Sequence, residues 1–237
     1  MSNVLDPVLI SGASKGIGKA CAHALASRGC QSLIITGRSI STLNAAKQDI
    51  KDKNPTCNVC VYVCNHENDE DIAALIHKLN EKKQIPQTII ANVGDNPVHR
   101  LGPKKMSSTT TEVINKTFNT NVTNTHALIS PFLRHYQRNG GRIILVGSQA
   151  YQLGVPGQLA YNVSKAALLG YKNTLVSEYG NKNVFCHLIN PGLVENQRTQ
   201  KLREKLGELD TVTEQEVAEI ICNTLMQEDK NGLEINI

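Results

Sequence analysis

The chain has 237 residues, of which 40% are hydrophobic, and carries a net charge of +4. This composition suits one large α/β domain spanning residues 1–237, and the interleaved lysines and acids do not indicate a nucleic-acid-binding protein. No apolar run reaches the roughly 18 residues of a membrane-spanning helix. The N-terminus also lacks a signal-peptide pattern, so we expect a cytoplasmic protein with no membrane partner.

Apolar runs and helical patterns alternate along the chain. Strands are predicted at residues 7–11, 31–37, 58–64, 87–94, 142–148, 183–192 and 233–237. Helices are predicted at residues 19–29, 41–54, 69–83, about 107–138, 157–180 and 213–227. The predicted strands are continuous apolar runs, as expected when helices cover both faces of a sheet. The pattern therefore predicts the α/β class, with a Rossmann-type doubly wound parallel sheet flanked by helices.

A glycine-rich turn, SGASKGIG at residues 11–18, lies between the first predicted strand and the first predicted helix. Without Cβ atoms, Gly12, Gly16 and Gly18 allow a tight turn and a close approach of the backbone to a pyrophosphate. The helix that follows directs its N–H groups and the positive end of its dipole at the same place. A plain tight turn is the alternative, but this position in a β–α unit favours a dinucleotide site.

The second strand ends in Thr36-Gly37-Arg38-Ser39, without an acidic residue. An acid at this point holds the ribose 2′-hydroxyl of NAD, whereas a basic residue accepts the 2′-phosphate of NADP. Lys15, in the glycine turn, adds a second positive charge. Two cations and no carboxylate favour NADP(H) over NAD(H); the alternative is that Arg38 only faces solvent.

Tyr161 and Lys165, in YNVSK, are four residues apart in a predicted helix and share one of its faces. In a partly buried site the lysine charge favours the phenolate, so we expect the tyrosine pKa to fall toward neutral. A tyrosine of that kind can act as a general acid or base. The alternative is that Tyr161 packs in the core while Lys165 reaches water.

The seven cysteines are an odd number, which suits free thiols in a reducing compartment. Cys57, Cys60 and Cys64 lie in TCNVCVYVC, which is typical of a strand, and there the spacing of three between Cys57 and Cys60 directs their side chains to opposite faces. No second cysteine pair accompanies them, so we expect no zinc site.

Several motifs, in order and over nearly the whole chain, resemble those of the short-chain dehydrogenase/reductase family. They are the glycine turn, ANVG at 91–94, Asn121 in TNVTNT, Ser148 in VGSQA, YNVSK at 161–165 and Pro191-Gly192. Within the family, residues 154–170 are most similar to the 3-oxoacyl-ACP reductases. The resemblance implies a homodimer or homotetramer that pairs through the long helix after the fourth strand and through the YNVSK helix.

The resemblance also assigns roles. Ser148 would hydrogen-bond a substrate carbonyl oxygen, and Tyr161 would protonate it as hydride arrives from the nicotinamide. Lys165 would lower the tyrosine pKa and hold the nicotinamide ribose, and Asn121 would position a water in a proton relay. The implied cofactor is NADP(H), with contacts from Gly12, Ser14, Lys15, Gly16, Ile17, Gly18, Arg38, Asn65, Asn92, Gly94, Tyr161, Lys165, Pro191, Gly192 and Val194.

Reduction of a small ketone, aldehyde or quinone is the first functional hypothesis. The second is a 3-oxoacyl-ACP reductase, in which Arg138 and Lys182 would dock an acyl carrier protein near the mouth of the site. A third is a non-catalytic NADPH sensor or scaffold. Oxidation of an alcohol would use the same residues. A serine hydrolase is set aside because Ser148 lacks a G-x-S-x-G elbow and evident His and Asp partners.

The chain departs from the family pattern at four positions. Asn65 occupies the position of the aspartate that usually binds the adenine. Ala91 and Val93 replace two residues of the NNAG motif, and Asn196 occupies the position of a threonine that often contacts the cofactor. The expected substrate lid, residues 196–212, is short and highly charged. Candidate pocket residues are Gln149, Tyr151, Val155, Leu159, Leu193 and the loop 95–100.

Overall fold

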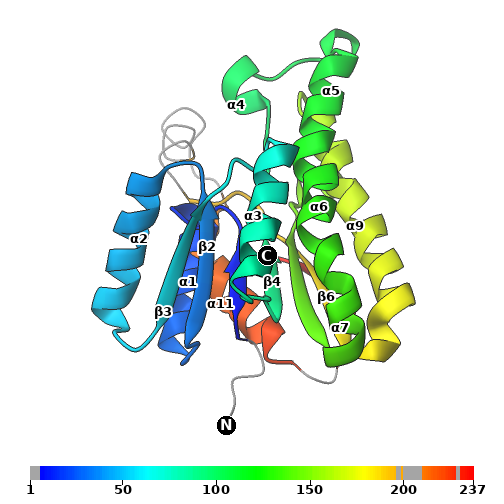
Figure 1. Cartoon of the computed structure of the whole chain (residues 1–237). Coiled ribbons are helices and arrows are strands. Elements are labelled where there is room, and N and C mark those ends of the chain that lie inside the picture. The colour runs from blue at the N-terminus through cyan, green and yellow to red at the C-terminus, as the bar shows by residue number, and fades with distance from the viewer. Residues whose placement is uncertain (1–5, 196–198, 200–209, 228–229) are drawn as a thin grey trace.

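A computed structural model describes residues 6–195, 199, 210–227 and 230–237 of the chain. Their strands form a parallel sheet of seven strands in the order β3-β2-β1-β4-β5-β6-β7 (Figure 1). The strands are β1 (Val8–Ile10), β2 (Ser32–Gly37), β3 (Asn58–Val63), β4 (Thr88–Ala91), β5 (Gly141–Val146), β6 (Val184–Asn190) and β7 (Glu234–Asn236). The predicted Rossmann-type parallel sheet is therefore confirmed.

The strand order reverses between β1 and β4. From β1 the chain builds outward through β2 to β3, and from β4 it builds the other way through β5 and β6 to β7. At such a reversal the connections leave in opposite directions, which opens a crevice beyond the carboxyl ends of the two strands. The glycine turn follows β1 and the segment 91–94 ends β4, so both expected cofactor motifs border this crevice.

Helices cover both faces of the sheet (Figure 1). One face carries α1 (Gly16–Ser27), α2 (Ile40–Lys53) and α11 (Glu214–Leu225). The other carries α3 (Asp69–Glu81), α6 (Asn124–Ile129), α7 (Leu133–Asn139) and α9 (Leu159–Tyr179). Helix α5 (Thr111–Phe118) continues upward from α6, beyond the carboxyl edge of the sheet.

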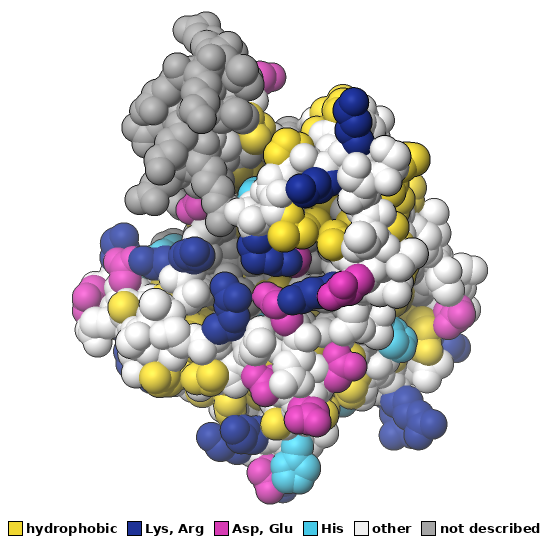
Figure 2. Space-filling view, turned by 90° about the horizontal axis from the view of Figure 1, so that it is seen from above, with side chains coloured by type: hydrophobic (Ala, Val, Ile, Leu, Met, Phe, Trp, Pro, Cys, Tyr) yellow, Lys and Arg dark blue, Asp and Glu magenta, His cyan; other side chains and the backbone are white. Residues whose placement is uncertain are grey.

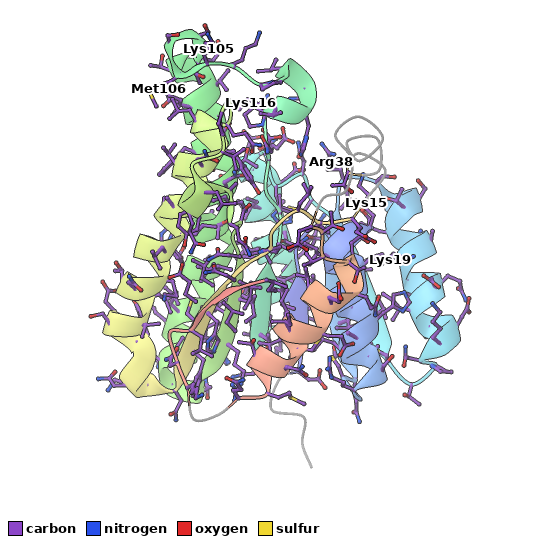
Figure 3. The ribbon with its side chains drawn as sticks, turned by 180° about the vertical axis from the view of Figure 1, so that it is seen from behind. Lys15, Lys19, Arg38, Lys105, Met106 and Lys116 are labelled. Atoms are coloured by element: carbon purple, nitrogen blue, oxygen red, sulfur yellow. The ribbon has the colours of Figure 1, made fainter. Side chains whose placement is uncertain are left out.

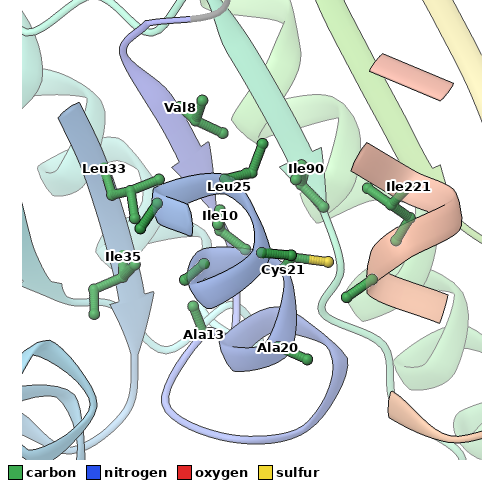
Figure 4. Close-up of a cluster of buried hydrophobic side chains, with 14 of the residues drawn as sticks. Val8, Ile10, Ala13, Ala20, Cys21, Leu25, Leu33, Ile35, Ile90 and Ile221 are labelled. Atoms are coloured by element: carbon green, nitrogen blue, oxygen red, sulfur yellow. The ribbon is translucent and has the colours of Figure 1, made fainter. Parts of the chain in front are cut away.

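Alternate residues of the central strands enter two separate cores, because successive strand side chains point to opposite faces. Val8 and Ile10 pack with Cys21 and Leu25 of α1 and with Ile221 of α11 (Figure 4). Leu9, between them, belongs to the core under α3, α6 and α9. Both faces of the central strands are thus buried, which explains their unbroken apolar sequences, whereas the edge strands β3 and β7 have exposed residues.

The region expected as one helix over about 107–138 is divided. After α5 come a π-helical turn (Asn119–Thr123), α6, a 3₁₀ turn (Ser130–Phe132) that contains Pro131, and α7. The proline has no N–H to donate, which accounts for the second interruption. The first interruption holds Asn121, and π turns within helices are frequent at functional sites.

The other predicted elements are confirmed with small shifts at their ends. The capping box at the start of α11 is present, because the Thr213 side chain accepts from the Glu216 N–H while the Glu216 side chain accepts from the Thr213 N–H. The sequence did not predict the short helices α4 (Val98–Leu101) and α8 (Ala150–Leu153) or the 3₁₀ turns at Met106–Ser108 and Gly180–Lys182. In the described part of the chain, no helix has the length and apolar character to cross a membrane.

Two glycine-to-alanine substitutions test how tightly the glycine turn is packed. A Cβ at Gly18 would lie 2.6 Å from the Gly12 carbonyl oxygen, whereas a Cβ at Gly170, on the exposed face of α9, meets nothing within 4 Å. We expect Gly18→Ala to lower the free energy of unfolding by about 1–3 kcal/mol through overpacking.

Gly170→Ala is the matched control and should raise the free energy of unfolding by about 0.5–1 kcal/mol, because alanine is the better helix former. Urea denaturation of both variants measures the two effects. A Gly18→Ala protein as stable as the wild type would show that the turn is looser than the structure indicates.

Candidate functional site

The glycine turn is fastened to the end of β4. The Ser11 hydroxyl oxygen accepts hydrogen bonds from the N–H groups of Asn92 (2.9 Å) and Val93 (3.1 Å). The Asn92 side-chain amide donates in return to the carbonyl oxygens of Ser11 (3.0 Å) and Gly12 (3.4 Å). Asn92 therefore holds the turn in place, and two expected cofactor motifs form one rigid unit.

The turn has the shape of an anion cradle. Gly12 and Gly16 have φ values of +68° and +65°, which favour glycine, and α1 starts at Gly16 with no acidic residue in its first turn. Lys15 is exposed at the rim, Ser14 is half-buried, and Ile17 packs on the core beneath. These residues fit the pyrophosphate of a dinucleotide, which binds where a helix N-terminus supplies N–H groups.

Glu214, at the start of α11, is a neighbour of the turn that the sequence did not reveal. Its Oε1 atom would lie 3.6 Å from a Cβ placed on Gly16. Burial raises the pKa of this carboxyl, and the charge of Lys15 acts in the opposite direction. The carboxyl group thus adds an ionisable charge beside the expected pyrophosphate position.

Arg38 lies at the carboxyl end of β2, near Lys15 and beside the turn (Figure 3). Contrary to the expectation that no carboxylate is near, the Glu67 Oε1 atom lies 3.4 Å from Nη1 of Arg38. The Arg38 side chain is 72% exposed and that of Glu67 31% exposed. Glu67 follows β3, so only the folding of the chain brings it to this position.

Asn65, expected to contact the adenine, is part of a structured loop after β3. Its backbone N–H donates to Asp71 (2.8 Å), and its side-chain oxygen accepts from the Glu67 N–H (3.2 Å). Beside it, the ring of His66 hydrogen-bonds Thr36 (2.8 Å), and burial lowers the His66 pKa to about 4. The histidine is therefore neutral at physiological pH.

The structure brings the four expected catalytic residues together. Lys165 is 3% exposed, and its ammonium donates to the carbonyl oxygen of Val146, at the end of β5 (2.8 Å). The Lys165 Nζ atom lies 5.7 Å from the centroid of the Tyr161 ring. Gly94 makes room for this ammonium, because a Cβ at that position would lie 2.8 Å from Nζ.

Asn121 links the segment after β4 to the helix that carries Tyr161. Its side-chain amide donates to the Asp95 carbonyl (2.9 Å) and to the Ser164 hydroxyl (2.8 Å), and its side-chain oxygen accepts from the Asp95 N–H (2.6 Å). Ser164 donates in turn to the Tyr161 carbonyl (2.8 Å). The Asn121 side chain is thus engaged in positioning the surrounding segments.

The protonation states differ from the sequence expectation. Burial raises the pKa of Tyr161, and a hydrogen bond with Ser148 offsets only part of the rise, so the expected fall toward neutral is wrong for the protein residues alone. Burial lowers the pKa of Lys165 to about 8. Desolvation therefore sets the direction of both pKa shifts, and at pH 7 the tyrosine is protonated.

Ser148 is half-buried just beyond β5, where its hydroxyl accepts from the Ala150 N–H (3.2 Å). Pro191 and Gly192 follow β6 at the same edge of the sheet, and the Gln149 N–H donates to the Pro191 carbonyl (3.0 Å). Val194 pairs with Val212 in an isolated parallel bridge. Asn196 and nearly all of the expected lid lie outside the described residues.

Two expected pocket residues make contacts with the last strand instead. The Gln149 side chain donates to the Ile237 carbonyl (2.7 Å), and the Tyr151 hydroxyl hydrogen-bonds the Glu234 carboxylate. The Asn190 side chain also donates to Glu234 (3.2 Å). The loop after Ser148 is thereby anchored to β7, a contact between distant segments that local sequence patterns do not reveal.

The expected docking cations for a carrier protein are not at the site. Arg138 ends α7 just before β5, and Lys182 lies just before β6. Both therefore lie at the amino edge of the sheet, opposite the carboxyl edge that carries Ser148 (Figure 1). The carboxyl edge instead presents acidic and basic side chains mixed together (Figure 2).

Among the described residues, no three His, Cys, Asp or Glu side chains are grouped to hold a metal ion. All seven cysteines are free. Burial raises the pKa of Cys57 to about 11 and that of Cys64 to about 12, so both are thiols at neutral pH.

Comparison with known proteins agrees with this geometry. A family model described as short chain dehydrogenase matches residues 6–207. A 3-oxoacyl-[acyl-carrier-protein] reductase of Buchnera aphidicola is 30% identical over 194 residues, covering 81% of this chain and 75% of the relative. Dehydrogenase/reductase SDR family member 4 of Mus musculus is 28% identical over 207 residues, covering 87% of this chain and 72% of the relative.

Solved structures share the fold at low sequence identity. The NADPH-dependent reductase YwfH, involved in bacilysin biosynthesis, is 19% identical with a TM-score of 0.85, covering 97% of this chain and 95% of that chain. An NAD⁺-bound xylitol dehydrogenase is also 19% identical, with a TM-score of 0.83 and coverage of 97% and 96%. One of these proteins is NADPH-dependent and the other binds NAD⁺, so the likeness of fold does not select between the two cofactors.

The buried ammonium of Lys165 predicts a pH-dependent difference in stability. Its pKa is about 8 in the folded protein and about 10.4 in an unfolded chain. Between these values the unfolded state binds more protons, so this group makes the fold more stable as pH rises. Relative to Lys165→Met, which lacks the group, the wild type should gain up to about 1.4 kcal/mol per pH unit.

Urea denaturation of both proteins at several pH values between about 7 and 10 measures this difference, because the other titrating groups cancel. Parallel stability curves for the two proteins would show that the Lys165 pKa is not lowered.

Proposed function

The chain belongs to the short-chain dehydrogenase family and is thus an oxidoreductase, and on that premise we propose that it reduces a carbonyl group to an alcohol with NADPH. The observation that carries the proposal is the cluster of Tyr161, Lys165, Asn121 and Ser148 at the carboxyl edge of the sheet. A proton donor, a hydroxyl and a buried cation lie beside the crevice where such sheets bind nucleotides.

When bound, the nicotinamide cofactor supplies the hydride. The Ser148 hydroxyl donates a hydrogen bond to the substrate carbonyl oxygen and polarises it. Tyr161, protonated at pH 7 because burial raises its pKa, gives that oxygen a proton. The Lys165 ammonium stabilises the phenolate that remains, and Asn121 holds α9 against the β4 segment, so the geometry is set before the substrate arrives.

The cofactor would lie across the ends of β1 and β4. The turn with Gly12, Gly16 and Gly18 would hold the pyrophosphate, and Lys165 the nicotinamide ribose. Arg38 and Lys15 support NADPH, because both are exposed cations at the rim beside the end of β2. Glu67 opposes this preference, because it is paired with Arg38.

A 3-oxoacyl thioester on an acyl carrier protein is the second candidate substrate. Several similar proteins are named 3-oxoacyl-[acyl-carrier-protein] reductases, with identities such as 30% and 31%. If a carrier protein docks, the exposed lysines near the site edge, Lys104 and Lys105, are better placed than Arg138 or Lys182.

The exposed apolar side chains of Phe118 and Val163, on α5 and α9, support association between copies of the chain.

The test of the proposal is NADPH consumption over a panel of ketones, aldehydes, quinones and 3-oxoacyl thioesters, with NADH in parallel. Tyr161→Phe should lower turnover by at least about 100-fold, because positioned proton transfer contributes a factor of this size. NADPH affinity, measured separately by fluorescence titration, should change little. Tyr171→Phe, which removes a hydroxyl from the same helix outside the cluster, is the control and should retain activity.

Turnover that survives in Tyr161→Phe would exclude this residue as the proton donor. A wild-type protein that binds NADPH tightly but reduces nothing on the panel would favour the non-catalytic sensor or scaffold.

The Arg38–Glu67 pair yields a prediction about cofactor selection. Glu67→Gln should strengthen binding of 2′,5′-ADP, which carries the 2′-phosphate, by about 1.4- to fivefold, because an exposed ion pair contributes about 0.2–1 kcal/mol. Binding of 5′-AMP should not change. Calorimetric titration of both nucleotides measures the difference.

Glu178→Gln makes the same change of charge at an exposed position on α9, away from the crevice. It should alter the affinity for neither nucleotide. If Glu67→Gln instead weakened binding of both nucleotides equally, Glu67 would act through the loop at Asn65 rather than through Arg38.

A further inference from the structure

An apolar cavity lies beside the candidate catalytic cluster, outside the cofactor crevice. Its volume is about 190 Å³, it is partly open to solvent, and it is bordered by α4, the 3₁₀ turn at Met106–Ser108, the start of α5 and the start of α9. Figure 3 labels Lys105 and Met106 at this end of α5, far from Lys15 and Arg38. Its apolar wall consists of Pro97, Val98, Leu101, Val113, Leu159 and Ala160.

Specific contacts fix the position of the segment that borders the cavity. The Lys104 N–H donates to the Gly157 carbonyl (3.1 Å), and the Asn96 side chain donates to Gln158 (2.9 Å). Gly157 has a φ of +79°, and a Cβ there would lie 2.7 Å from Pro103, so only glycine allows this close approach. The segment over the cavity is thus tied at two points to the loop before α9.

Both walls adjoin, along the chain, the segments that carry the catalytic cluster. On one side, Asp95 is bonded to Asn121, and Pro97, two residues later, lines the cavity. On the other side, Leu159 and Ala160 line the cavity and immediately precede Tyr161. A group that binds at Tyr161 and carries a chain therefore has an apolar surface within reach.

The lining selects against polar ligands. Among the described residues, Lys104 is the only charged side chain that lines the cavity, and no acid does. The Thr109 hydroxyl already donates to the Lys105 carbonyl, and the Gln158 side-chain oxygen already accepts from Asn96, which leaves Ser108, Thr110 and the Gln158 amide as polar partners in a mainly apolar lining. A sugar or polyol would replace only some of its hydrogen bonds to water there, whereas an alkyl chain needs none.

We propose that this cavity binds the aliphatic chain of the carbonyl substrate, so that the enzyme favours medium-chain ketones or 3-oxoacyl compounds over small or highly hydroxylated carbonyls. The inference rests on the proposed reduction. An apolar cavity of about 150 Å³ is enough to hold benzene, so this volume suits about six to eight carbons. Each buried methylene contributes about 0.8 kcal/mol, which is roughly a fourfold gain in affinity.

The first measurement is kinetic and uses a series of methyl ketones from 2-butanone to 2-decanone. KM should fall by up to about fourfold per added carbon and level off once the chain fills the cavity. Val113→Phe, which fills the cavity, should raise KM at least about tenfold for 2-octanone and leave that for 2-butanone nearly unchanged. Met226→Phe, at an exposed position after α11, is the matched control and should behave as the wild type.

The second measurement needs neither cofactor nor turnover. The chain contains no tryptophan, so Leu101→Trp, at a position that is 48% exposed on the cavity wall, introduces a single fluorescent reporter. Titration with 2-octanone should shift its emission to the blue in a saturable manner, and 2-butanone should not. Adding Val113→Thr, which keeps the size of the side chain but adds a hydroxyl, should weaken the response.

The outcomes separate the inference from the proposed function. A saturable shift that Val113→Thr weakens, with no turnover of any ketone, would support the cavity and overturn the reduction. Turnover that is independent of chain length, together with no fluorescence response, would overturn the cavity inference and leave the reduction standing.

Discussion

The buried ammonium of Lys165 is the constraint around which the rest of the site is arranged. Its side chain is 3% exposed and its hydrogen bond goes to the Val146 carbonyl rather than to a carboxylate. A charge in this environment is unfavourable, which is why its pKa falls to about 8. The ammonium stays buried despite this cost, because Gly94 leaves space for it and because α9 fixes the lysine beside Tyr161.

That arrangement depends on contacts between segments far apart in the sequence. Asn121, on the π-helical turn, bonds to Asp95 after β4 and to Ser164 in α9, so it sets the position of one wall against the other. The final strand anchors the loop after Ser148 through Gln149 and Tyr151. A regular α-helix at this point would direct the Asn121 side chain differently. The π turn is therefore what lets Asn121 reach both segments.

The sequence predicted the strands and their parallel arrangement from continuous apolar runs, and the family resemblance of short motifs named the residues of the cluster. It missed Glu67 and Glu214, because an acid in the β3–α3 loop and another at the start of α11 reach the cofactor crevice only through the tertiary fold. The placement of Arg138 and Lys182 near the site was wrong for a different reason. Each residue comes just before a predicted strand, so the sequence already indicated the amino edge of the parallel sheet, opposite the site.

The tyrosine pKa also shows why a motif alone does not give the chemistry. Spacing placed a cation beside a phenol and predicted a lowered pKa, but the depth of burial, which spacing does not reveal, raises it. A protonated phenol is suited to give a proton and poorly suited to take one. At neutral pH the protein residues alone therefore leave Tyr161 ready to give a proton to an oxygen atom, which is the step that the proposed reduction requires. Oxidation of an alcohol would begin instead from the phenolate, so that step would need further positive charge in the crevice to lower the Tyr161 pKa.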